Sequence, residues 1–193
     1  MSVHSFLKSK GYHTFEGNCQ ELPCQIIDLI KLVTDPDILR VMEIGFNAGH
    51  SAELFLESNP QITLTSFDLS LHEYVQSAKE YIDKVYPNRH TLVLGDSRET
   101  IPKYIQDHPG EKFDLIFIDG GHTYEIAKSD LENCRHLAHS NTIVIMDDTT
   151  FIGGSINGPT KTWIEYLKSQ KIIELGNKEY SFERGMVWGK YVL

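Results

Sequence analysis

The stretch VMEIGFNAGHS, residues 41–51, decides the fold, because an apolar run ends there in a glycine-containing turn that leads into a helical pattern. Gly45 and Gly49 permit a tight turn and a close approach of the backbone to a ligand. A turn of this kind also suits a dinucleotide, but the spacing is not G-x-G-x-x-G. The stretch therefore predicts a strand, a turn and a helix of an α/β unit, and it leaves open that the glycines serve the turn alone.

Short apolar runs rich in Ile, Val, Leu and Phe alternate with helical patterns along most of the chain. Near-continuous apolar runs are typical of strands buried on both faces, as in a parallel sheet. The alternation predicts a doubly wound, mostly parallel sheet with right-handed crossovers and helices on both faces. The predicted strands are 40–45, 62–68, 90–96, 113–119 and 142–147, and the predicted helices are 20–33, 51–57, 73–85, 98–107 and 123–137.

The end of the chain follows a different pattern. A helix is predicted over 159–169, with Pro159 at its first position, where a proline is well tolerated. Strands are predicted over 171–175 and 186–192, joined by a loop at 177–184 that would make the last strand antiparallel. The glycine-rich segment 151–158 is either a substrate lid or a flexible connection.

Composition limits the class of protein. The 193 residues carry a formal net charge of −9, and their Lys and Arg residues form no basic stripe, which disfavours nucleic acid as a partner. No stretch of about 18 apolar residues and no secretory signal is found, so we expect a cytoplasmic protein without a membrane span. Cys19, Cys24 and Cys134 match no zinc spacing and no disulfide framework, which favours reduced thiols.

Acidic residues stand at the ends of the second and third predicted strands. Asp68 follows Gly49 by 19 residues, and a carboxylate at that place can accept two hydrogen bonds from a ribose diol. A helix N-cap or a solvated carboxylate is the alternative for Asp68. Asp96 can accept from an exocyclic amine, whereas capping of the following helix would by itself explain Ser97. These positions predict a ligand that contains a nucleoside.

Carboxylates also end the fourth and fifth predicted strands, where Asp119, Asp147 and Asp148 would meet in one crevice. Their mutual repulsion is costly unless a proton or a cation intervenes. Carboxylate oxygens suit Mg²⁺, Mn²⁺ or Ca²⁺ rather than a soft metal. The sequence therefore predicts a divalent cation on these residues, and the alternative is that Asp148 caps a turn while Asp119 alone faces the ligand.

These motifs, in this order and spacing, resemble those of class I S-adenosylmethionine-dependent methyltransferases over roughly residues 40–148. The resemblance implies a Rossmann-like, seven-stranded sheet with an antiparallel last strand. We expect a single domain with an N-terminal helical segment (1–39), a cofactor-binding core (40–148) and a C-terminal helix with strands (149–193).

The resemblance also assigns roles to residues. The turn would wrap the methionine part of S-adenosylmethionine, Asp68 would hold the ribose hydroxyls, and Asp96 with Ser97 would flank the adenine. The residues expected to bind this cofactor are Glu43, Gly45, Phe46, Asn47, Gly49, Ser51, Asp68, Leu69, Gly95, Asp96, Ser97 and Asp119.

Within that class, the chain resembles small-molecule O-methyltransferases of the catechol and caffeoyl-CoA type, and bacterial methyltransferases that share the DGGH string at 119–122. The resemblance places metal ligands at Asp119, Asp147 and Asp148, although Asp148 stands where the family has Asn. His122 stands where the family has its catalytic Lys, and histidine can act as a general base near neutral pH. Asp119 and His122 are therefore the expected catalytic residues.

The expected activity is transfer of a methyl group from S-adenosylmethionine to a hydroxyl of a small-molecule acceptor, assisted by a divalent cation. Three alternatives stay open: a cofactor-binding module without turnover, a metal-independent methyltransferase for a sugar or other natural product, and a nicotinamide-dependent oxidoreductase, which the glycine spacing disfavours. A homodimer is also left open. Tyr12, Phe15, Phe151 and Trp163 could line an apolar acceptor pocket, although aromatic side chains more often belong to the core.

Overall fold

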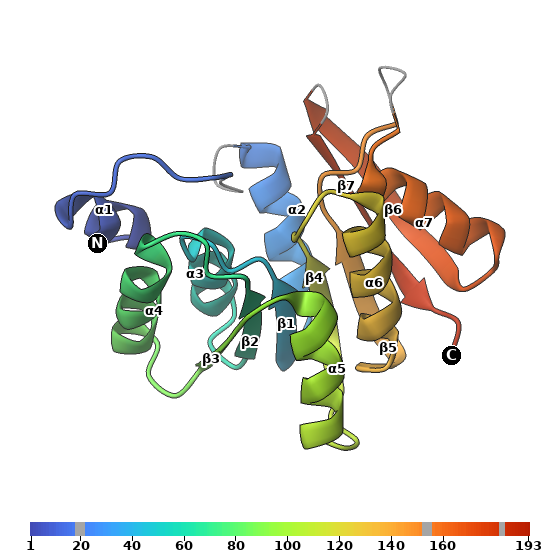
Figure 1. The fold of residues 1–193 in the computed structure, drawn as a ribbon, viewed down its shortest axis with the longest axis horizontal. Helices are drawn as coiled ribbons and strands as arrows, with labels where there is room; N and C mark the ends of the chain where they lie inside the picture. Colours follow the sequence, from blue (N-terminus) through green and yellow to red (C-terminus); the bar gives the residue numbers. More distant parts are fainter. Residues whose placement is uncertain (18–21, 152–155, 182–183) are drawn as a thin grey trace.

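The computed structural model describes residues 1–17, 22–151, 156–181 and 184–193. These residues form a seven-stranded sheet in the order β3-β2-β1-β4-β5-β7-β6, with helices on both sides (Figure 1). The strands are β1 (Arg40–Ile44), β2 (Thr63–Asp68), β3 (His90–Leu94), β4 (Phe113–Ile118), β5 (Ala138–Met146), β6 (Ile172–Ser181) and β7 (Arg184–Tyr191). The helices are α1 (Val3–Ser9), α2 (Pro23–Val33), α3 (His50–Ser58), α4 (Tyr74–Val85), α5 (Ser97–Asp107), α6 (Tyr124–Arg135) and α7 (Gly158–Lys168).

Parallel pairing joins the first five strands, and antiparallel pairing joins the last two. β1 pairs in parallel with β2 on one side and with β4 on the other, so the strand order reverses between β1 and β4. In open α/β sheets, ligands bind beyond the carboxyl ends of the strands at such a reversal. β7 pairs antiparallel with both β5 and β6. The prediction of a doubly wound, mostly parallel sheet with an antiparallel last strand is confirmed.

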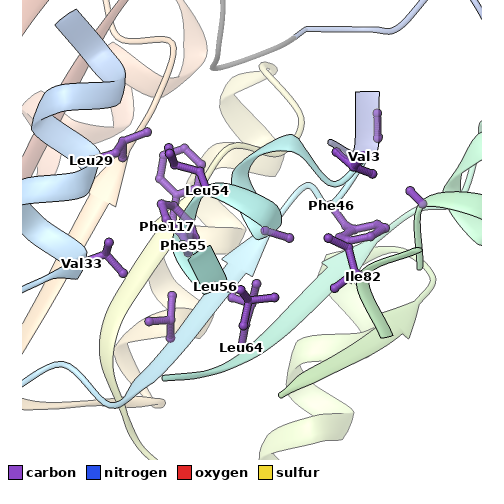
Figure 2. Packing of buried hydrophobic residues seen from close by; sticks show 14 of the residues in the cluster. Val3, Leu29, Val33, Phe46, Leu54, Phe55, Leu56, Leu64, Ile82 and Phe117 are labelled. Atoms are coloured by element: carbon purple, nitrogen blue, oxygen red, sulfur yellow. The ribbon is translucent and has the colours of Figure 1, made fainter. Parts of the chain in front are cut away.

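Both faces of the sheet are buried, as alternate residues of β1 illustrate. Val41 belongs to one core cluster with Phe55 of α3, whereas Met42 belongs to a second cluster with Trp163 of α7. Successive side chains of a strand point to opposite faces of a sheet. Figure 2 shows the first cluster, in which side chains of α2 and α3 meet Phe117 of β4. Burial on both faces explains the near-continuous apolar runs that predicted these strands.

Helix α1 lies in the segment 1–39 that is expected to be helical, at residues for which the sequence analysis gives no helix bounds. Val3 and Leu7, one turn apart, are both 0% exposed, and the Ser2 hydroxyl caps the helix by accepting the Ser5 backbone N–H at 3.2 Å. With 7 residues the helix is too short to show a periodic pattern or to be stable alone. Its stability comes from packing against α3 and α4.

Two strands near the C-terminus are longer than predicted. β6 continues to Ser181 and β7 begins at Arg184, so the predicted loop at 177–184 is wrong for its described part. β6 is the edge strand of the sheet, and its pairing with β7 shifts register between Glu174 and Gly176. Its outward-facing residues are partly polar, so the sequence has no continuous apolar run that would mark the whole strand. β5 begins at Ala138 rather than at 142, beside a register irregularity with β4, and the helix predicted over 123–137 ends at Arg135.

Some features of the sequence fall outside the described residues. Cys19 is one of them, and so are residues 152–155 of the glycine-rich segment 151–158. Cys24 is exposed and Cys134 is buried, and both are free thiols. Within the described ranges, no helix is long and apolar enough to cross a membrane.

Candidate functional site

A cavity of about 490 Å³ opens at the carboxyl ends of the parallel strands, where the strand order reverses. Its wall contains most of the residues predicted to bind a cofactor, to catalyse or to hold a metal, namely Gly45, Phe46, Asn47, Ser51, Asp68, Leu69, Gly95, Asp96, Ser97, Asp119, His122, Asp147 and Asp148. Glu43 and Gly49 are the predicted cofactor residues that do not line it. The strand ends therefore bring together residues from β1 through β5 in one space.

The glycines of the turn after β1 are required by packing as well as by backbone conformation. Gly45 has a φ of +98°, and a Cβ on it would lie 2.0 Å from the backbone oxygen of Asp119. Gly49, the N-cap of α3, has a φ of +76°, and a Cβ there would lie 3.1 Å from the Phe46 ring. Gly45 thus lets the ends of β1 and β4 meet, which places Asp119 directly beside the turn.

Glu43 points into the protein interior rather than into the cavity. It is 0% exposed, and its carboxylate accepts hydrogen bonds from the hydroxyls of Ser51 at 2.8 Å and Ser66 at 2.6 Å. Burial raises the pKa of Glu43 to about 7, against the opposing effect of these two hydrogen bonds. Because Ser51 lines the cavity, Glu43 supports the cavity wall from behind.

Asp68 ends β2 with its carboxylate fixed by two backbone N–H groups. Asn47 donates to Oδ2 at 2.7 Å and Ser70 donates to Oδ1 at 2.6 Å. Asn47 has a φ of 48°, a left-handed conformation that Asn adopts more readily than most residues. Each carboxylate oxygen can still accept another hydrogen bond. Asp68 can therefore receive two hydroxyl groups from a ligand in the cavity.

Asp96 is the N-cap of α5, and its carboxylate is already paired with a residue that the sequence analysis missed. It accepts the backbone N–H of Arg98 at 2.9 Å and the Arg98 guanidinium at 3.0 Å from Nε and 2.5 Å from Nη2. These hydrogen bonds lower the pKa of Asp96. Arg98 lines the cavity, and Leu69, 54% exposed, adds an apolar wall.

Asp147 is 9% exposed and Asp119 is half-buried, and both carboxylates lie close to other negative charges. Burial, followed by the charges of Asp147, Asp148 and Glu43, raises the pKa of Asp119 well above its usual range. Burial, followed by the charge of Asp148, raises the pKa of Asp147 to about 7. The side-chain amide of Gln25 on α2 donates to both oxygens of Asp147 at 2.8 Å each. The sequence analysis missed Gln25.

His122 forms the mouth of the site together with Asp148. Its Nε2 lies 2.7 Å from Asp148 Oδ2, and its side chain is 62% exposed. The hydrogen bond to Asp148 raises the pKa of His122 above its ordinary value. Ligand atoms of Asp119, His122 and Asp148 lie within 4.8 Å of one another, and this is the group among the described residues that could hold a metal ion. Asp147, predicted as a ligand, is not a member of that group, and both of its carboxylate oxygens accept the side-chain amide of Gln25.

The N-terminal segment adds a wall that the sequence motifs do not cover. Glu16 and Gly17 line the cavity. The side-chain amide of Asn47 donates to the Glu16 carbonyl oxygen, and the Tyr74 hydroxyl donates to Asn47 Oδ1 at 2.6 Å. His72 Nε2 lies 2.6 Å from a Glu16 carboxylate oxygen. The segment is thereby attached to the turn after β1 and to α4.

Arg184, the first residue of β7, brings positive charge to the carboxylates. It lines the cavity, and its charge lowers the pKa of Asp119 and Asp147 against the larger opposite effect of burial. No functional residue was expected at this position, because the sequence pattern predicts a loop there.

The aromatic residues proposed for an acceptor pocket lie elsewhere in the fold. Among the residues that the structure describes, neither Tyr12, Phe15, Phe151 nor Trp163 lines the cavity. Trp163 is 0% exposed in the core. Tyr12 and Phe15 contact the Tyr74 ring edge-on, with centroids at 6.0 and 5.3 Å. Trp163 therefore belongs to the core, and the rings of Tyr12 and Phe15 pack the N-terminal segment against Tyr74 of α4.

Comparisons with known proteins agree with this arrangement. A family model described as "Methyltransferase domain" matches residues 42–149. A search of curated protein sequences gives no match. An O-methyltransferase from Bacillus cereus in complex with S-adenosylhomocysteine (SAH) has a TM-score of 0.76 at 16% identity, covering 98% of this chain and 90% of that chain.

Two further solved structures share the fold. The O-methyltransferase TomG from Streptomyces achromogenes, involved in tomaymycin synthesis and solved with S-adenosylmethionine (SAM), has a TM-score of 0.73 at 14% identity over 98% of this chain and 87% of that chain. CalS11, a TDP-rhamnose 3'-O-methyltransferase in calicheamicin biosynthesis, has a TM-score of 0.67 at 20% identity over 88% and 78%. At these identities the likeness establishes the fold alone.

Proposed function

The chain belongs to the methyltransferase domain family, and we propose that it transfers the methyl group of SAM to a hydroxyl oxygen of a small molecule. The family expected from the sequence is confirmed, and the nicotinamide alternative loses its support. One observation carries the proposal: a single cavity of about 490 Å³ joins Asp68 to Asp119, His122 and Asp148. Proteins of similar fold have been solved with SAM or SAH bound.

The cofactor would lie along the ends of β1, β2 and β3. Asp68 would accept the two ribose hydroxyls, since each of its oxygens has one free acceptor position after Asn47 and Ser70 are counted. Leu69 would cover the adenine ring. The carboxylate of Asp96 would accept a hydrogen bond from the adenine amine on a lone pair that Arg98 does not use. The turn after β1 would hold the methionine part, with Ser51 at its base.

Methyl transfer is an in-line displacement in which an acceptor oxygen forms a bond to the methyl carbon while the carbon–sulfur bond breaks. The electron pair of the broken bond stays on sulfur, and the acceptor must lose a proton. Alignment of the two reactants can supply up to about 7–11 kcal/mol. His122 can take the proton through Nδ1, because its Nε2 is bonded to Asp148.

The closeness of His122 to the carboxylates of Asp119 and Asp148 favours a second role for it, that of a metal ligand. Asp119, His122 and Asp148 would together hold a divalent cation, since their ligand atoms lie within 4.8 Å of one another. A mixed nitrogen and oxygen set suits Mn²⁺ better than Mg²⁺ or Ca²⁺. When bound, such a cation lowers the pKa of a hydroxyl on the acceptor. In that case His122 is a ligand, and another group takes the proton.

Calorimetric titration with SAH tests the proposed function directly. We expect micromolar binding by the wild type, weakened by more than about tenfold in Asp68→Ala. Asp107→Ala, which removes an exposed carboxylate from α5, is the matched control and should bind as the wild type does. No binding of SAH or SAM by the wild type would refute the proposal. Binding without turnover in an acceptor screen of sugars and phenols would favour a non-catalytic module.

Manganese titration separates the two roles of His122. A bound cation should be lost in Asp148→Asn and His122→Ala and retained in Asp147→Asn, because Asp147 does not belong to the group of close ligand atoms. Absence of Mn²⁺ binding by the wild type with SAH present would leave His122 as the base of a metal-independent enzyme.

The remaining expectations depend on the same site. We propose that residues 1–39 belong to one domain with the rest of the chain, because Glu16 and Gly17 complete the cavity wall. A cytoplasmic location and a homodimer stay predictions.

A further inference from the structure

We propose that Asn157, the N-cap of α7, is a positioning residue that holds Asp148 against His122 for the transfer reaction. The inference rests on the proposed function and names a residue that sets the geometry of the same site. Asn157 does not line the cavity, so it can act on a ligand only through its neighbours. Its effect is carried by the first turn of α7, which contacts the segments that follow β4 and β5.

Asp148 has a backbone conformation that is uncommon for a residue with a side chain. Its φ is 53°, in the left-handed region. Such conformations persist where the surrounding structure fixes them, and they gather at active sites. The backbone dihedrals orient the Cα–Cβ bond, so they also determine where the carboxylate can point. Whatever fixes the backbone at Asp148 therefore directs its Oδ2 toward His122 Nε2, which lies 2.7 Å away.

Asn157 and Thr160 hold this stretch of backbone from the start of α7. The Asn157 side-chain amide donates to the Asp148 carbonyl oxygen. Its Oδ1 accepts the Thr160 backbone N–H at 2.9 Å and the Thr160 hydroxyl at 2.6 Å. The Thr160 hydroxyl oxygen accepts the backbone N–H of Thr150 at 2.7 Å. The chain is therefore held on both sides of Thr149, and the hydrogen bond on the Asp148 side comes from Asn157.

Gly158 brings the same turn of α7 against the backbone of His122. A Cβ on Gly158 would lie 2.4 Å from the His122 carbonyl oxygen and 2.5 Å from the Tyr124 backbone nitrogen. A residue without a side chain permits so close an approach of two backbones. The first turn of α7 thus contacts His122 through Gly158 and Asp148 through Asn157. It thereby sets the distance between the two residues of the proposed pair.

Helix capping explains one half of the contacts that Asn157 makes. An N-cap side chain accepts an N–H from the first turn of its helix, as Asn157 Oδ1 does for Thr160. Capping makes no use of the amide nitrogen, which is the group that reaches Asp148. Serine caps a helix about as well as asparagine. A serine hydroxyl in place of Oδ1 leaves no second group for the Asp148 carbonyl oxygen, so Asn157→Ser separates capping from positioning.

Turnover and SAH titration of Asn157→Ser test the inference. We expect kcat to fall by about 10–100-fold on an acceptor found by screening, because small displacements of aligned groups are costly. The Kd for SAH should stay within about threefold of the wild type, since Asn157 lies outside the cavity wall. The matched control Asn177→Ser removes an exposed side-chain amide donor from β6 and should change neither value. A kcat in Asn157→Ser equal to that of the wild type would overturn the inference.

Crystal structures of the wild type and of Asn157→Ser test the geometry without turnover. We expect His122 Nε2 and Asp148 Oδ2 to lie within hydrogen-bond distance in the wild type and more than about 3.5 Å apart in the variant. An intact pair in the variant would overturn the inference, whatever its activity. Failure of the wild type to bind SAH would refute the cofactor assignment, and the two crystal structures would still decide whether Asn157 holds the pair.

A second variant covers the case in which Asn157→Ser shows no cooperative thermal melt. Asn157→Asp keeps the size of the side chain and its ability to cap the helix, but it has no amide to donate. The same fall in kcat and the same separation of His122 from Asp148 are expected. Wild-type kcat or an intact pair in Asn157→Asp would likewise overturn the inference.

Discussion

The side-chain amide of Gln25 donates to both carboxylate oxygens of Asp147 at 2.8 Å each. Gln25 on α2 is 2% exposed and Asp147 at the end of β5 is 9% exposed, so water does not replace this contact. The two residues are 122 positions apart in the sequence. The contact ties a helix outside the matched segment 42–149 to Asp147, which lines the same cavity as Asp119, His122 and Asp148.

Gln25→Ala should lower the free energy of unfolding by about 1–3 kcal/mol, because a buried carboxylate loses its donor. Urea denaturation at pH 7 measures the change. The matched control is Gln76→Ala on the exposed face of α4, for which we expect a change within about 0.5 kcal/mol. If both variants lose the same free energy of unfolding, the hydrogen bonds to Asp147 contribute no stability beyond the effect of replacing a helical glutamine.

The central strands could be predicted from the sequence because their burial on both faces leaves near-continuous apolar runs, as in Phe113–Ile118. The edge strand β6 could not be delimited, because its outer residues alternate in exposure and include polar side chains such as Lys178. Helix α1 has too few residues for a periodic pattern. The sequence patterns therefore define the buried elements of this fold and miss those that depend on tertiary packing.

The candidate site was predictable where topology alone determines it. Asp68, Asp119 and His122 follow strands, and the carboxyl ends of parallel strands meet at one edge. Gln25 was not predictable, because a helical glutamine carries no sign of a partner 122 residues away. The direction of Glu43 was hidden as well, since in a strand buried on both faces the pattern does not indicate which residues face a cavity.

Gly45→Ala should unfold the protein or cost more than about 4 kcal/mol. A Cβ at this position lies 2.0 Å from the Asp119 backbone oxygen, and backbone atoms cannot move aside as a flexible side chain can. Gly110→Ala is the matched control, because Gly110 also has a positive φ, +85°, and a Cβ there meets nothing within 4 Å. It should cost only the left-handed backbone strain, about 1–2 kcal/mol. Thermal unfolding measures the loss of stability in both variants, and similar losses would contradict the steric argument.

The contribution of Glu43 to the stability of the wild type should fall as the pH rises from about 4.5 to about 7. Burial raises its pKa from 4.5 to about 7, so the folded state binds this proton more tightly than the unfolded state. The stabilisation is fully present below pH 4.5 and is lost as the pH passes through about 7. Glu43→Gln should therefore lose less stability between pH 5 and pH 8, by up to about 3 kcal/mol. Urea denaturation at both pH values measures the free energy of unfolding. An equal loss between pH 5 and pH 8 in variant and wild type would contradict the raised pKa of Glu43.

His122→Ala should reduce kcat by about 10²–10⁴-fold on an acceptor found by screening, because the proton acceptor is removed. The Kd for SAH should stay within about threefold of the wild type, since His122 lies at the mouth of the cavity and its side chain is 62% exposed. His136→Ala removes an exposed histidine at the end of α6 and should leave kcat unchanged. Unchanged turnover in His122→Ala would assign proton removal to another group.

Asp148→Asn should move the acid limb of the kcat profile to lower pH. The hydrogen bond from Asp148, 2.7 Å from His122 Nε2, raises the pKa of His122, and a base works only when it is unprotonated. The wild type therefore loses activity as the pH falls through that raised pKa, and loss of the carboxylate charge lowers the pH at which this happens. The control is Asp114→Asn, which alters a similar pair with His139 at 2.9 Å near the amino end of β4. Its acid limb should match that of the wild type, and an unmoved limb in Asp148→Asn would show that His122 is not the titrating base.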